Sequence, residues 1–267
     1  MPADVPDRTI LYKFRSLATD KHIEFARDII LNHRLFAAPP NSFNDPFDCD
    51  TPICFEATEA EKIARAMARI KLENPSLSDE EARRCAPSRY LAAETTGLAQ
   101  IRTSIEIKYG VVSLSAVIDD PLLWGHYASG HTGISIRFRA ADLRHTNFFG
   151  DALAVTYQEE RPIINFYRDN DDERLRKQLL TKSLSWAYEK ERRIFEMNRQ
   201  NRPYVTFHPS MVDAIYLGCR IDDAHRKLVR EWLAMRDSFS MPRLFQARTS
   251  ERKYELVFEE IPAAAAC

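Results

Sequence analysis

Two glutamates in the segment W-A-Y-E-K-E-R-R-I-F (residues 186–195) have a type and spacing that suit catalysis. Glu189 and Glu191 are two positions apart, so on a β-strand both carboxylates project from one face. Two like charges that close disfavour simultaneous ionisation, which suits a site where one carboxylate polarises a hydroxyl group. The same residues also fit a helix end at which Glu189 pairs with Arg192 or Arg193. The residues by themselves leave both interpretations open.

Two serines and a loop with aromatic and histidine side chains form a second group. Ser113 and Ser115 share one face of a predicted strand, because side chains alternate along a strand. They either line a site or mark the solvent side of an edge strand. Trp124 and His126 follow in the loop, where both could border a ligand. The alternative for Trp124 is a place in the hydrophobic core. His126 and His131 are five apart, which differs from the i, i+4 spacing of a helical zinc pair.

A third group lies on the predicted opening strand, L-Y-K-F-R-S, where Lys13 and Arg15 alternate. A basic residue in such a strand is usually on the surface. An arginine at the start of a site can instead grip a phosphate through two parallel hydrogen bonds.

The fourth group is the turn-rich motif F-N-D-P-F-D, in which Pro46 stiffens the chain between Asn44, Asp45 and Asp48. Asx-turns, in which such side chains bond their own backbone, explain the composition without a ligand. A metal site and a contact to a ribose are the functional alternatives.

The composition excludes several classes of site and partner. Thirty-eight Lys and Arg against 39 Asp and Glu give a formal charge of −1, so there is no bulk electrostatic signal for nucleic acid or an anionic membrane. The chain has only seven glycines, and neither G-x-x-x-x-G-K-[ST] nor G-x-G-x-x-G occurs, which excludes the two common phosphate-binding loops. The five cysteines include no C-x-x-C pair, which argues against a disulfide framework and structural zinc. With no long apolar run and no signal-peptide segment, we expect a cytoplasmic protein without a membrane partner.

Many short strands with interspersed helices must position these groups. We expect an α+β fold with a mostly antiparallel, mixed sheet, as a single domain over residues 1–267. The segment 56–108, rich in Ala, Glu, Arg and Ile, predicts a helical insert, broken near Asn74 and restarted by a Ser78–Glu81 capping box. Strands are predicted at 10–14, 34–38, 110–115, 133–138, 152–157, 191–195, 203–207, 213–218, 243–247 and 254–258, and further helices at 20–33, 121–127, 170–186 and 222–236.

Taken together, these motifs resemble a bacterial family catalogued as domain of unknown function 2971. The resemblance rests on L-Y-K-F-R-S, F-N-D-P-F-D, W-G-H-Y-A and W-x-Y-E-x-E-R in this order, and covers nearly the whole chain. It implies membership of that family and no particular activity.

At a second level, the order of Arg15, Ser113-x-Ser115 and Glu189-x-Glu191 is similar to the Arg, Ser-x-Ser, Glu-x-Glu triad of mono-ADP-ribosyltransferases. The resemblance implies that Arg15 holds a phosphate of NAD, Ser115 orients the glutamate, and Glu191 bonds the nicotinamide ribose and stabilises its cation. Glu189 would engage the acceptor, and Leu114 stands where the family usually has Thr. The cofactor-binding residues that we assign on this basis are Arg15, Tyr12, Ser113, Ser115, Trp124, His126, Asn44 and Asp45.

This resemblance implies an NAD-dependent transferase with NAD as substrate, no required metal and a macromolecular acceptor that the sequence does not name. A toxin or a defence effector is the cellular role considered for such an enzyme. Cleavage of the N-glycosidic bond of NAD passes through a cationic ribose, which a fixed carboxylate stabilises as in glycosidases. That chemistry needs no glycine-rich loop.

Two other functions stay open. A metal-dependent phosphodiesterase or nuclease would use Asp45, Asp48, Glu189 and Glu191 as Mg²⁺ ligands, but it leaves the serines without a role. A non-enzymatic binding module would line a recognition pocket with aromatic side chains, namely Trp124, His126, Tyr127 and Trp186.

Overall fold

The structure is a computed structural model that describes residues 10–139, 152–236 and 241–262, with the side chains of 96–107 left out of the description. The chain divides into two compact units. Unit 1 comprises residues 1–38, 110–155 and 186–267, and unit 2 comprises residues 39–109 and 156–185. The single domain expected over the whole chain stays a prediction.

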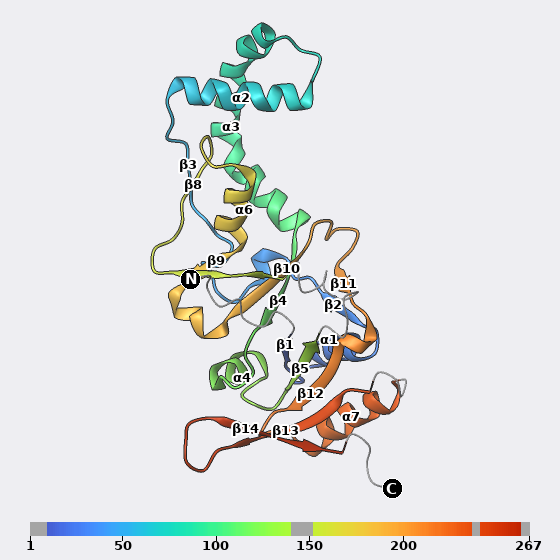
Figure 1. The fold of residues 1–267 in the computed structure, drawn as a ribbon. Coiled ribbons are helices and arrows are strands. Elements are labelled where there is room, and N and C mark those ends of the chain that lie inside the picture. Colours follow the sequence, from blue (N-terminus) through green and yellow to red (C-terminus); the bar gives the residue numbers. More distant parts are fainter. Residues whose placement is uncertain (1–9, 140–151, 237–240, 263–267) are drawn as a thin grey trace, which may run out of the picture. The chain divides into compact units, whose positions relative to one another are not determined.

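A large mixed sheet forms the centre of unit 1 (Figure 1). Among the described residues eight strands follow the order β14-β13-β12-β5-β1-β4-β10-β6, and of their neighbouring pairs only β12–β13 is parallel. This confirms the predicted α+β fold with a mostly antiparallel, mixed sheet. The strands are β1 (Ile10–Arg15), β4 (Gly110–Ser115), β5 (Ile134–Arg139), β6 (Leu153–Ala154), β10 (Glu191–Glu196), β12 (Val212–Leu217), β13 (Arg243–Thr249) and β14 (Leu256–Ile261).

Two hydrophobic clusters cover the two faces of this sheet. On one face Leu11 and Ile136 pack with Ile29 of helix α1 (Asp20–Ile30) and Trp232 of helix α7 (Asp223–Ala234). On the other face Phe14 packs with Trp124 and Leu123 of helix α4 (Pro121–Tyr127) and with Tyr216. The period-two alternation of strand side chains separates Leu11 from Phe14 in this way. Outside the large sheet, β2 (Arg34–Phe36) pairs with β11 (Tyr204–Thr206), and the 3₁₀ segments η3 (Leu184–Glu189) and η4 (Pro209–Met211) complete the elements.

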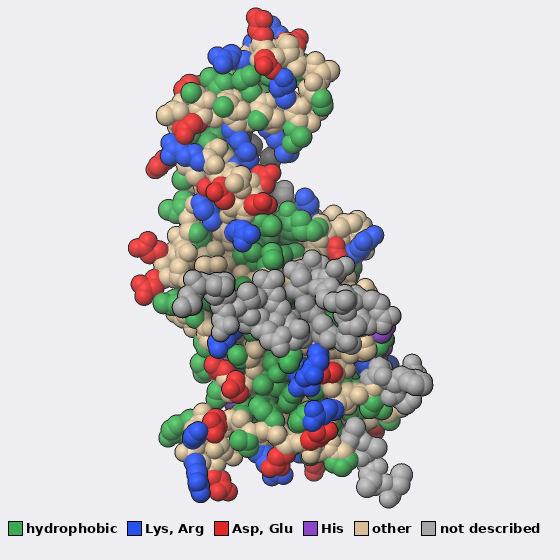
Figure 2. Space-filling view, viewed as in Figure 1, with side chains coloured by type: hydrophobic (Ala, Val, Ile, Leu, Met, Phe, Trp, Pro, Cys, Tyr) green, Lys and Arg blue, Asp and Glu red, His purple; other side chains and the backbone are tan. Residues whose placement is uncertain are grey.

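Unit 2 is mostly helical. Helices α2 (Glu59–Glu73) and α3 (Asp79–Lys108) carry interspersed charges of both signs (Figure 2). Several of these side chains form ion pairs, such as Arg69 with Glu73 and Lys71 with Asp79. The predicted capping box is confirmed, because the Glu81 amide donates to Ser78 Oγ at 3.2 Å and the Ser78 amide donates to Glu81 Oε2 at 2.9 Å. The remaining elements are η1 (Pro40–Ser42), β3 (Ile53–Cys54), β7 (Thr156–Gln158), β8 (Ile164–Asn165), α6 (Asp171–Leu179) and β9 (Thr181–Ser183), with β3–β8 and β7–β9 pairing in parallel.

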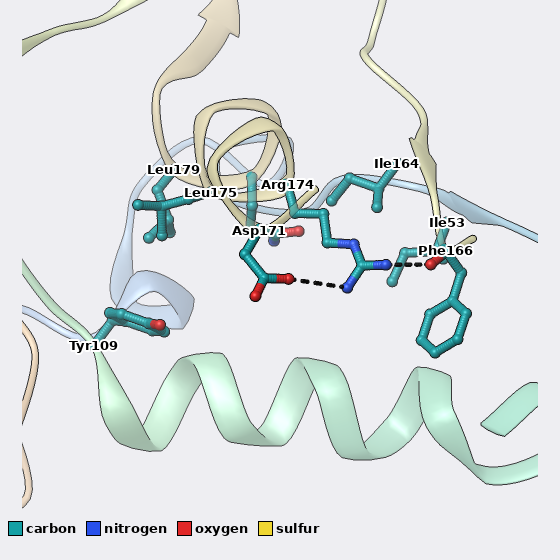
Figure 3. Close-up of a pocket in the computed structure, with 9 residues that line it drawn as sticks. Ile53, Tyr109, Ile164, Phe166, Asp171, Arg174, Leu175 and Leu179 are labelled. Carbon is teal, nitrogen blue, oxygen red and sulfur yellow. Dashed lines mark hydrogen bonds and ion pairs between the residues drawn. The ribbon is translucent and has the colours of Figure 1, made fainter. Parts of the chain in front are cut away.

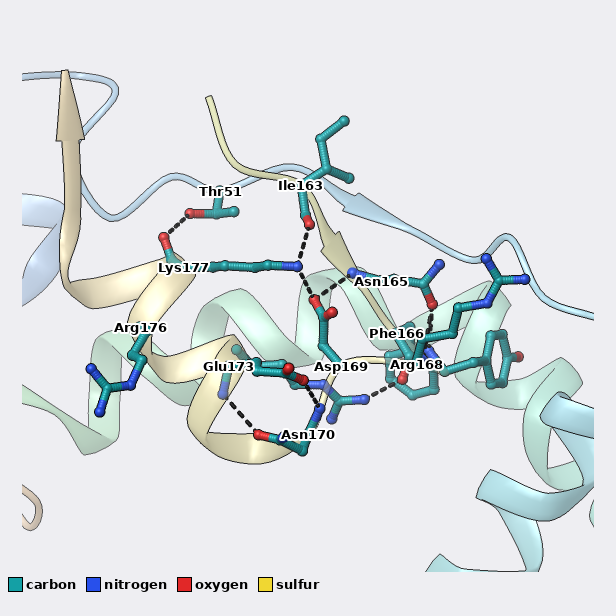
Figure 4. Close-up of polar contacts among 12 residues, drawn as sticks. Thr51, Ile163, Asn165, Phe166, Arg168, Asp169, Asn170, Glu173, Arg176 and Lys177 are labelled. Carbon is teal, nitrogen blue, oxygen red and sulfur yellow. Dashed lines mark hydrogen bonds and ion pairs between the residues drawn. The ribbon is translucent and has the colours of Figure 1, made fainter. Parts of the chain in front are cut away.

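Helix α6 also begins with a capping box, and an ion pair ties it to the residues before it (Figure 4). The Glu173 amide donates to Asn170 Oδ1 at 2.9 Å, and Lys177 Nζ lies 2.6 Å from Asp169 Oδ2. The helix predicted over 170–186 is wrong beyond Leu179, because the next residues pair with β7 instead. Within the part of the chain that the structure describes, no helix combines the length and apolar character needed to cross a membrane.

Candidate functional site

Three side chains predicted for the site lie in one row across neighbouring strands of unit 1. Tyr12 of β1 stands directly opposite Ser115 of β4, and Ser115 stands directly opposite Glu191 of β10. Residues directly opposite in antiparallel strands share a face of the sheet. Tyr12, Ser115 and Glu191 therefore meet on the face that α4 covers.

Tyr12 is tied to a polar group on β5 and β12. Its ring contacts the Tyr216 ring at 6.1 Å between centroids, and Arg137 donates to the Tyr216 hydroxyl at 2.9 Å. Burial raises the pKa of Tyr12, and the guanidinium of Arg137 opposes that change. Tyr12 is thus a fixed, protonated hydroxyl at neutral pH.

The hydroxyl of Ser115 holds the backbone that leads into β10. Its Oγ lies 2.7 Å from the Glu189 carbonyl oxygen and 2.9 Å from that of Val117, and it accepts from the Val117 amide at 3.1 Å. Ser115 is buried, so these contacts are shielded from water. Ser115 therefore fixes the position of the Glu189 backbone, immediately before strand β10.

Glu191 is held by an arginine on its own strand. Arg193 Nε donates to Glu191 Oε1 at 2.8 Å, and Nη2 donates to Oε2 at 3.1 Å. The Arg193 side chain is fully buried, and Glu191 keeps 5% of its surface. Two parallel hydrogen bonds of this kind fix the orientation of the carboxylate as well as its position.

Glu189 lies outside the strand, contrary to the expectation that both carboxylates project from one strand face. It ends η3, and Lys190 with φ +43° lies between it and β10. This left-handed residue interrupts the alternation on which the expectation rested. The Glu189 side chain is buried, and the Tyr127 hydroxyl donates to its Oε1 at 2.6 Å.

Three ring-bearing side chains of unit 1 lie close to one another. The exposed His126 ring lies 6.0 Å from the Trp186 ring and 6.4 Å from the Tyr188 ring, measured between centroids. Burial, with the charges of Glu189 and Asp120, raises the pKa of Tyr188 to about 12. We call His126, Trp186 and Tyr188 the aromatic cluster.

Trp124 belongs to the core of unit 1. It is fully buried, its indole N–H donates to the Ile118 carbonyl at 2.7 Å, and its ring meets Phe14 edge-on at 5.2 Å. Of the two loop residues predicted to border a ligand, His126 is exposed and Trp124 supports the fold.

Lys13 alternates with Arg15 on the opening strand, but it is not among the site residues assigned from the sequence. Strands β1 and β4 pair only at Tyr12 and Ser115, and beyond that point Lys13 Nζ donates to the carbonyl oxygen of Ser113 at 2.6 Å. Burial and the charge of Arg15 place the pKa of Lys13 well below its usual value, while Glu191 and Glu189 act in the opposite direction. The ammonium thus lies within electrostatic reach of both glutamates.

Arg15, like Lys13 two residues before it, follows the alternation of β1 to the face opposite that of Tyr12. Its guanidinium carbon lies 5.7 Å from the centroid of the Phe25 ring on α1, and its buried Nε has no partner among the described residues. Burial lowers the pKa of Arg15 to about 10. Strand β1 therefore does not bring Arg15 into the row of Tyr12, Ser115 and Glu191.

Asn44 and Asp45 belong to unit 2, so the structure describes them separately from the glutamates. Asp45 Oδ1 accepts from the Phe47 amide at 2.9 Å, as in an Asx-turn. Asp48 is buried 3.8 Å from Lys182 Nζ. Among the described residues no group of three or more His, Cys, Asp and Glu side chains is arranged to hold a metal ion.

Comparison with models of protein families gives a match over part of the chain. The model of the family described as "Protein of unknown function (DUF2971)" matches residues 123–194. No curated protein and no solved structure matches the chain. The matched segment contains Tyr127, the aromatic cluster, Glu189 and Glu191, so the family resemblance includes the carboxylate part of the candidate site.

Proposed function

We propose that the chain is an NAD-dependent ADP-ribosyltransferase-like enzyme that modifies a macromolecular acceptor. The observation that carries the proposal is the position of Glu191, which starts β10 opposite Ser115 and is oriented by two hydrogen bonds from Arg193. A carboxylate fixed before the reaction stabilises a developing positive charge without reorganisation. An ADP-ribosyltransferase-like scaffold for unit 1 is part of the same proposal.

The reaction is a glycosyl transfer. The bond between C1′ of the nicotinamide ribose and the ring nitrogen breaks, and nicotinamide leaves with the bonding electron pair. The ribose passes through a cationic state that Glu191 stabilises, as carboxylates do in glycosidases. An acceptor oxygen or nitrogen then bonds to C1′ and gives up one proton, so that NAD⁺ and acceptor become ADP-ribosylated acceptor, nicotinamide and H⁺.

The neighbouring side chains have matching roles in this proposal. Glu189, oriented by the Tyr127 hydroxyl, engages the acceptor. The exposed His126 and the half-buried rings of Trp186 and Tyr188 offer faces on which a planar ring can stack. The amine of Lys13 lies near the glutamates, whose charges favour its protonated form, on the side where β1 and β4 no longer pair.

The test is transfer of label from adenylate-labelled NAD to proteins and nucleic acids of a cell lysate. Glu191→Gln should abolish labelling, and Glu196→Gln, at the other end of β10 where its Oε1 accepts from the Asn198 amide, should leave it unchanged. Circular dichroism establishes that each variant is folded. Equal labelling by the original chain and a folded Glu191→Gln variant, or labelling by neither, removes the proposal.

A further inference from the structure

A partly open pocket of about 200 Å³ is lined by residues of unit 2 (Figure 3). Among the described residues, helix α6 and the parallel pair of β3 and β8 supply most of the lining side chains. The walls are mainly apolar, with aromatic rings from Phe166 and Tyr109. The other lining residues are Ile53, Ile164, Asp171, Arg174, Leu175, Gln178 and Leu179.

Arg174 brings a positive charge into this apolar setting. Its side chain is 24% exposed, and its guanidinium carbon lies 5.2 Å from the centroid of the Phe166 ring. Burial and the neighbouring charge of Arg65 lower the pKa of Arg174, and Asp171 and Asp169 oppose that change only in part. The surroundings of the guanidinium therefore disfavour its charged form.

The hydrogen-bond donors of Arg174 are incompletely used. Nη2 donates to the Phe166 carbonyl, and Nη1 reaches Asp171 Oδ1 only at 3.5 Å. The same Oδ1 accepts from Arg65 at 3.2 Å, and the Asp171 side chain is 87% exposed. The buried Nε has no partner among the described residues. A guanidinium has five N–H donors, and a buried donor without an acceptor destabilises the fold. An additional acceptor at Arg174 would therefore offset part of that destabilisation.

The position of Arg174 is fixed before any ligand binds. The Asn170–Glu173 capping box holds the first turn of α6, and the Lys177–Asp169 ion pair ties the helix to the loop that precedes it (Figure 4). Asp169 Oδ2 also accepts from the Asn165 amide of β8 at 2.8 Å. Binding therefore needs little ordering of the backbone, which favours affinity for a small ligand.

The pocket volume is sufficient for a small ligand. An engineered apolar cavity of about 150 Å³ accepts benzene. A cavity of about 200 Å³ thus accommodates a single aromatic ring with one small substituent. The flat rings of Phe166 and Tyr109 in the walls favour a planar ligand over a branched one.

We infer that this cavity binds a small aromatic monocarboxylate. Its ring lies among the apolar side chains, and its carboxylate accepts hydrogen bonds from Arg174, whose fork of donors matches a carboxylate in geometry. This inference does not depend on the NAD chemistry proposed for unit 1.

The test is isothermal titration of the full chain with benzoate, and with benzamide as a neutral molecule of nearly the same shape. Benzoate should bind saturably and at least about tenfold more tightly than benzamide, because a hydrogen bond to a charged group contributes that much.

Two variants locate the site, with a third as control. Arg174→Gln should weaken benzoate binding at least about tenfold and bring it to the level of benzamide. Leu175→Phe, which fills the cavity without changing charge, should remove binding of both molecules, and the exposed Arg176→Gln on the same helix should change neither.

Several results would overturn the inference. Equal affinity for benzoate and benzamide would show that the cavity does not recognise the carboxylate. Loss of benzoate binding with Arg176→Gln as large as with Arg174→Gln would show attraction by surface charge alone. No saturable binding of benzoate, or binding unaffected by a folded Leu175→Phe variant, would exclude the cavity. The comparison of the two molecules on the original chain decides the matter even if Arg174→Gln does not fold.

Discussion

Lys13 on β1 donates a 2.6 Å hydrogen bond to the carbonyl oxygen of Ser113 on β4, just beyond the position where these strands stop pairing. A side-chain ammonium thus bonds a strand carbonyl at the point where the ladder of backbone hydrogen bonds has ended. The negative charges of Glu189 and Glu191 act to raise the pKa of the same group. Lys13 therefore contributes both to holding β1 against β4 and to the electrostatics of the candidate site.

Lys13→Met should alter how stability depends on alkaline pH. The pKa of Lys13 is lowered in the folded chain, by burial first and then by Arg15, so the unfolded chain binds more protons between that pKa and about 10.5. Stability of the original chain should therefore rise relative to Lys13→Met as pH increases through this window. Urea unfolding at a series of pH values, with the difference taken between the two proteins, measures the effect.

Lys227→Met, at an exposed lysine of α7, is the control for the substitution itself and should change the free energy of unfolding little. A flat difference for Lys13→Met would mean that Lys13 titrates alike in the folded and unfolded chains.

Glu191→Gln should destabilise unit 1 by about 1–3 kcal/mol, because it removes the negative charge that accepts two hydrogen bonds from the fully buried Arg193. The double variant Glu191→Leu, Arg193→Met removes both charges and should recover most of that loss, since apolar replacements of a buried ion pair are often neutral. Unfolding by urea gives both values. Equal destabilisation by the single and double variants would contradict this view of the pair.

Tyr127→Phe removes the hydroxyl that donates to the buried Glu189 carboxylate. We expect a loss of about 1–2 kcal/mol in the free energy of unfolding. In a chain of this size that is a fall of several degrees in Tm, about 2–4 °C per kcal/mol. The fully exposed Tyr254→Phe should leave Tm unchanged, and a similar small effect for both variants would show that the bond to Glu189 contributes nothing.

Two glycines should respond to alanine in opposite directions. A Cβ at Gly218 would lie 2.1 Å from the carbonyl oxygen of His131, so Gly218→Ala forces backbone apart and should cost about 1–3 kcal/mol or more. A Cβ at Gly125 would meet nothing within 4 Å, and this residue lies within α4. Gly125→Ala should gain up to about 1 kcal/mol through helix propensity. Thermal unfolding of the two variants checks both signs, and a stabilised Gly218→Ala would be inconsistent with the packing described.

The sequence predicts the strands of unit 1 well, because their alternation is a local property. Segment 110–115 forms β4 over the predicted residues, and 191–195 forms β10 with one residue more. The helix predicted over 170–186 fails after Leu179, because pairing of β9 with β7 depends on residues distant in the chain. The pattern of residues within one segment does not show which distant strand that segment pairs with.

The candidate site shows the same division. Spacing identifies Glu189 and Glu191 as neighbours, but not the left-handed backbone of Lys190 that separates them. Motif order groups Arg15 with these glutamates, whereas strand alternation directs Arg15 toward Phe25 on α1. The role of Lys13 depends on where two strands stop pairing, which no spacing within one segment reveals.

The most direct measurement for the proposed chemistry is release of nicotinamide from NAD labelled in the nicotinamide ring, by the purified chain and without acceptor. We expect saturable release by the original chain, and a rate at least about 100-fold lower for the folded double variant Glu191→Leu, Arg193→Met, which lacks the carboxylate that stabilises the ribose cation. Release at the same rate by both proteins, or no release by the original chain, would contradict the assignment of Glu191.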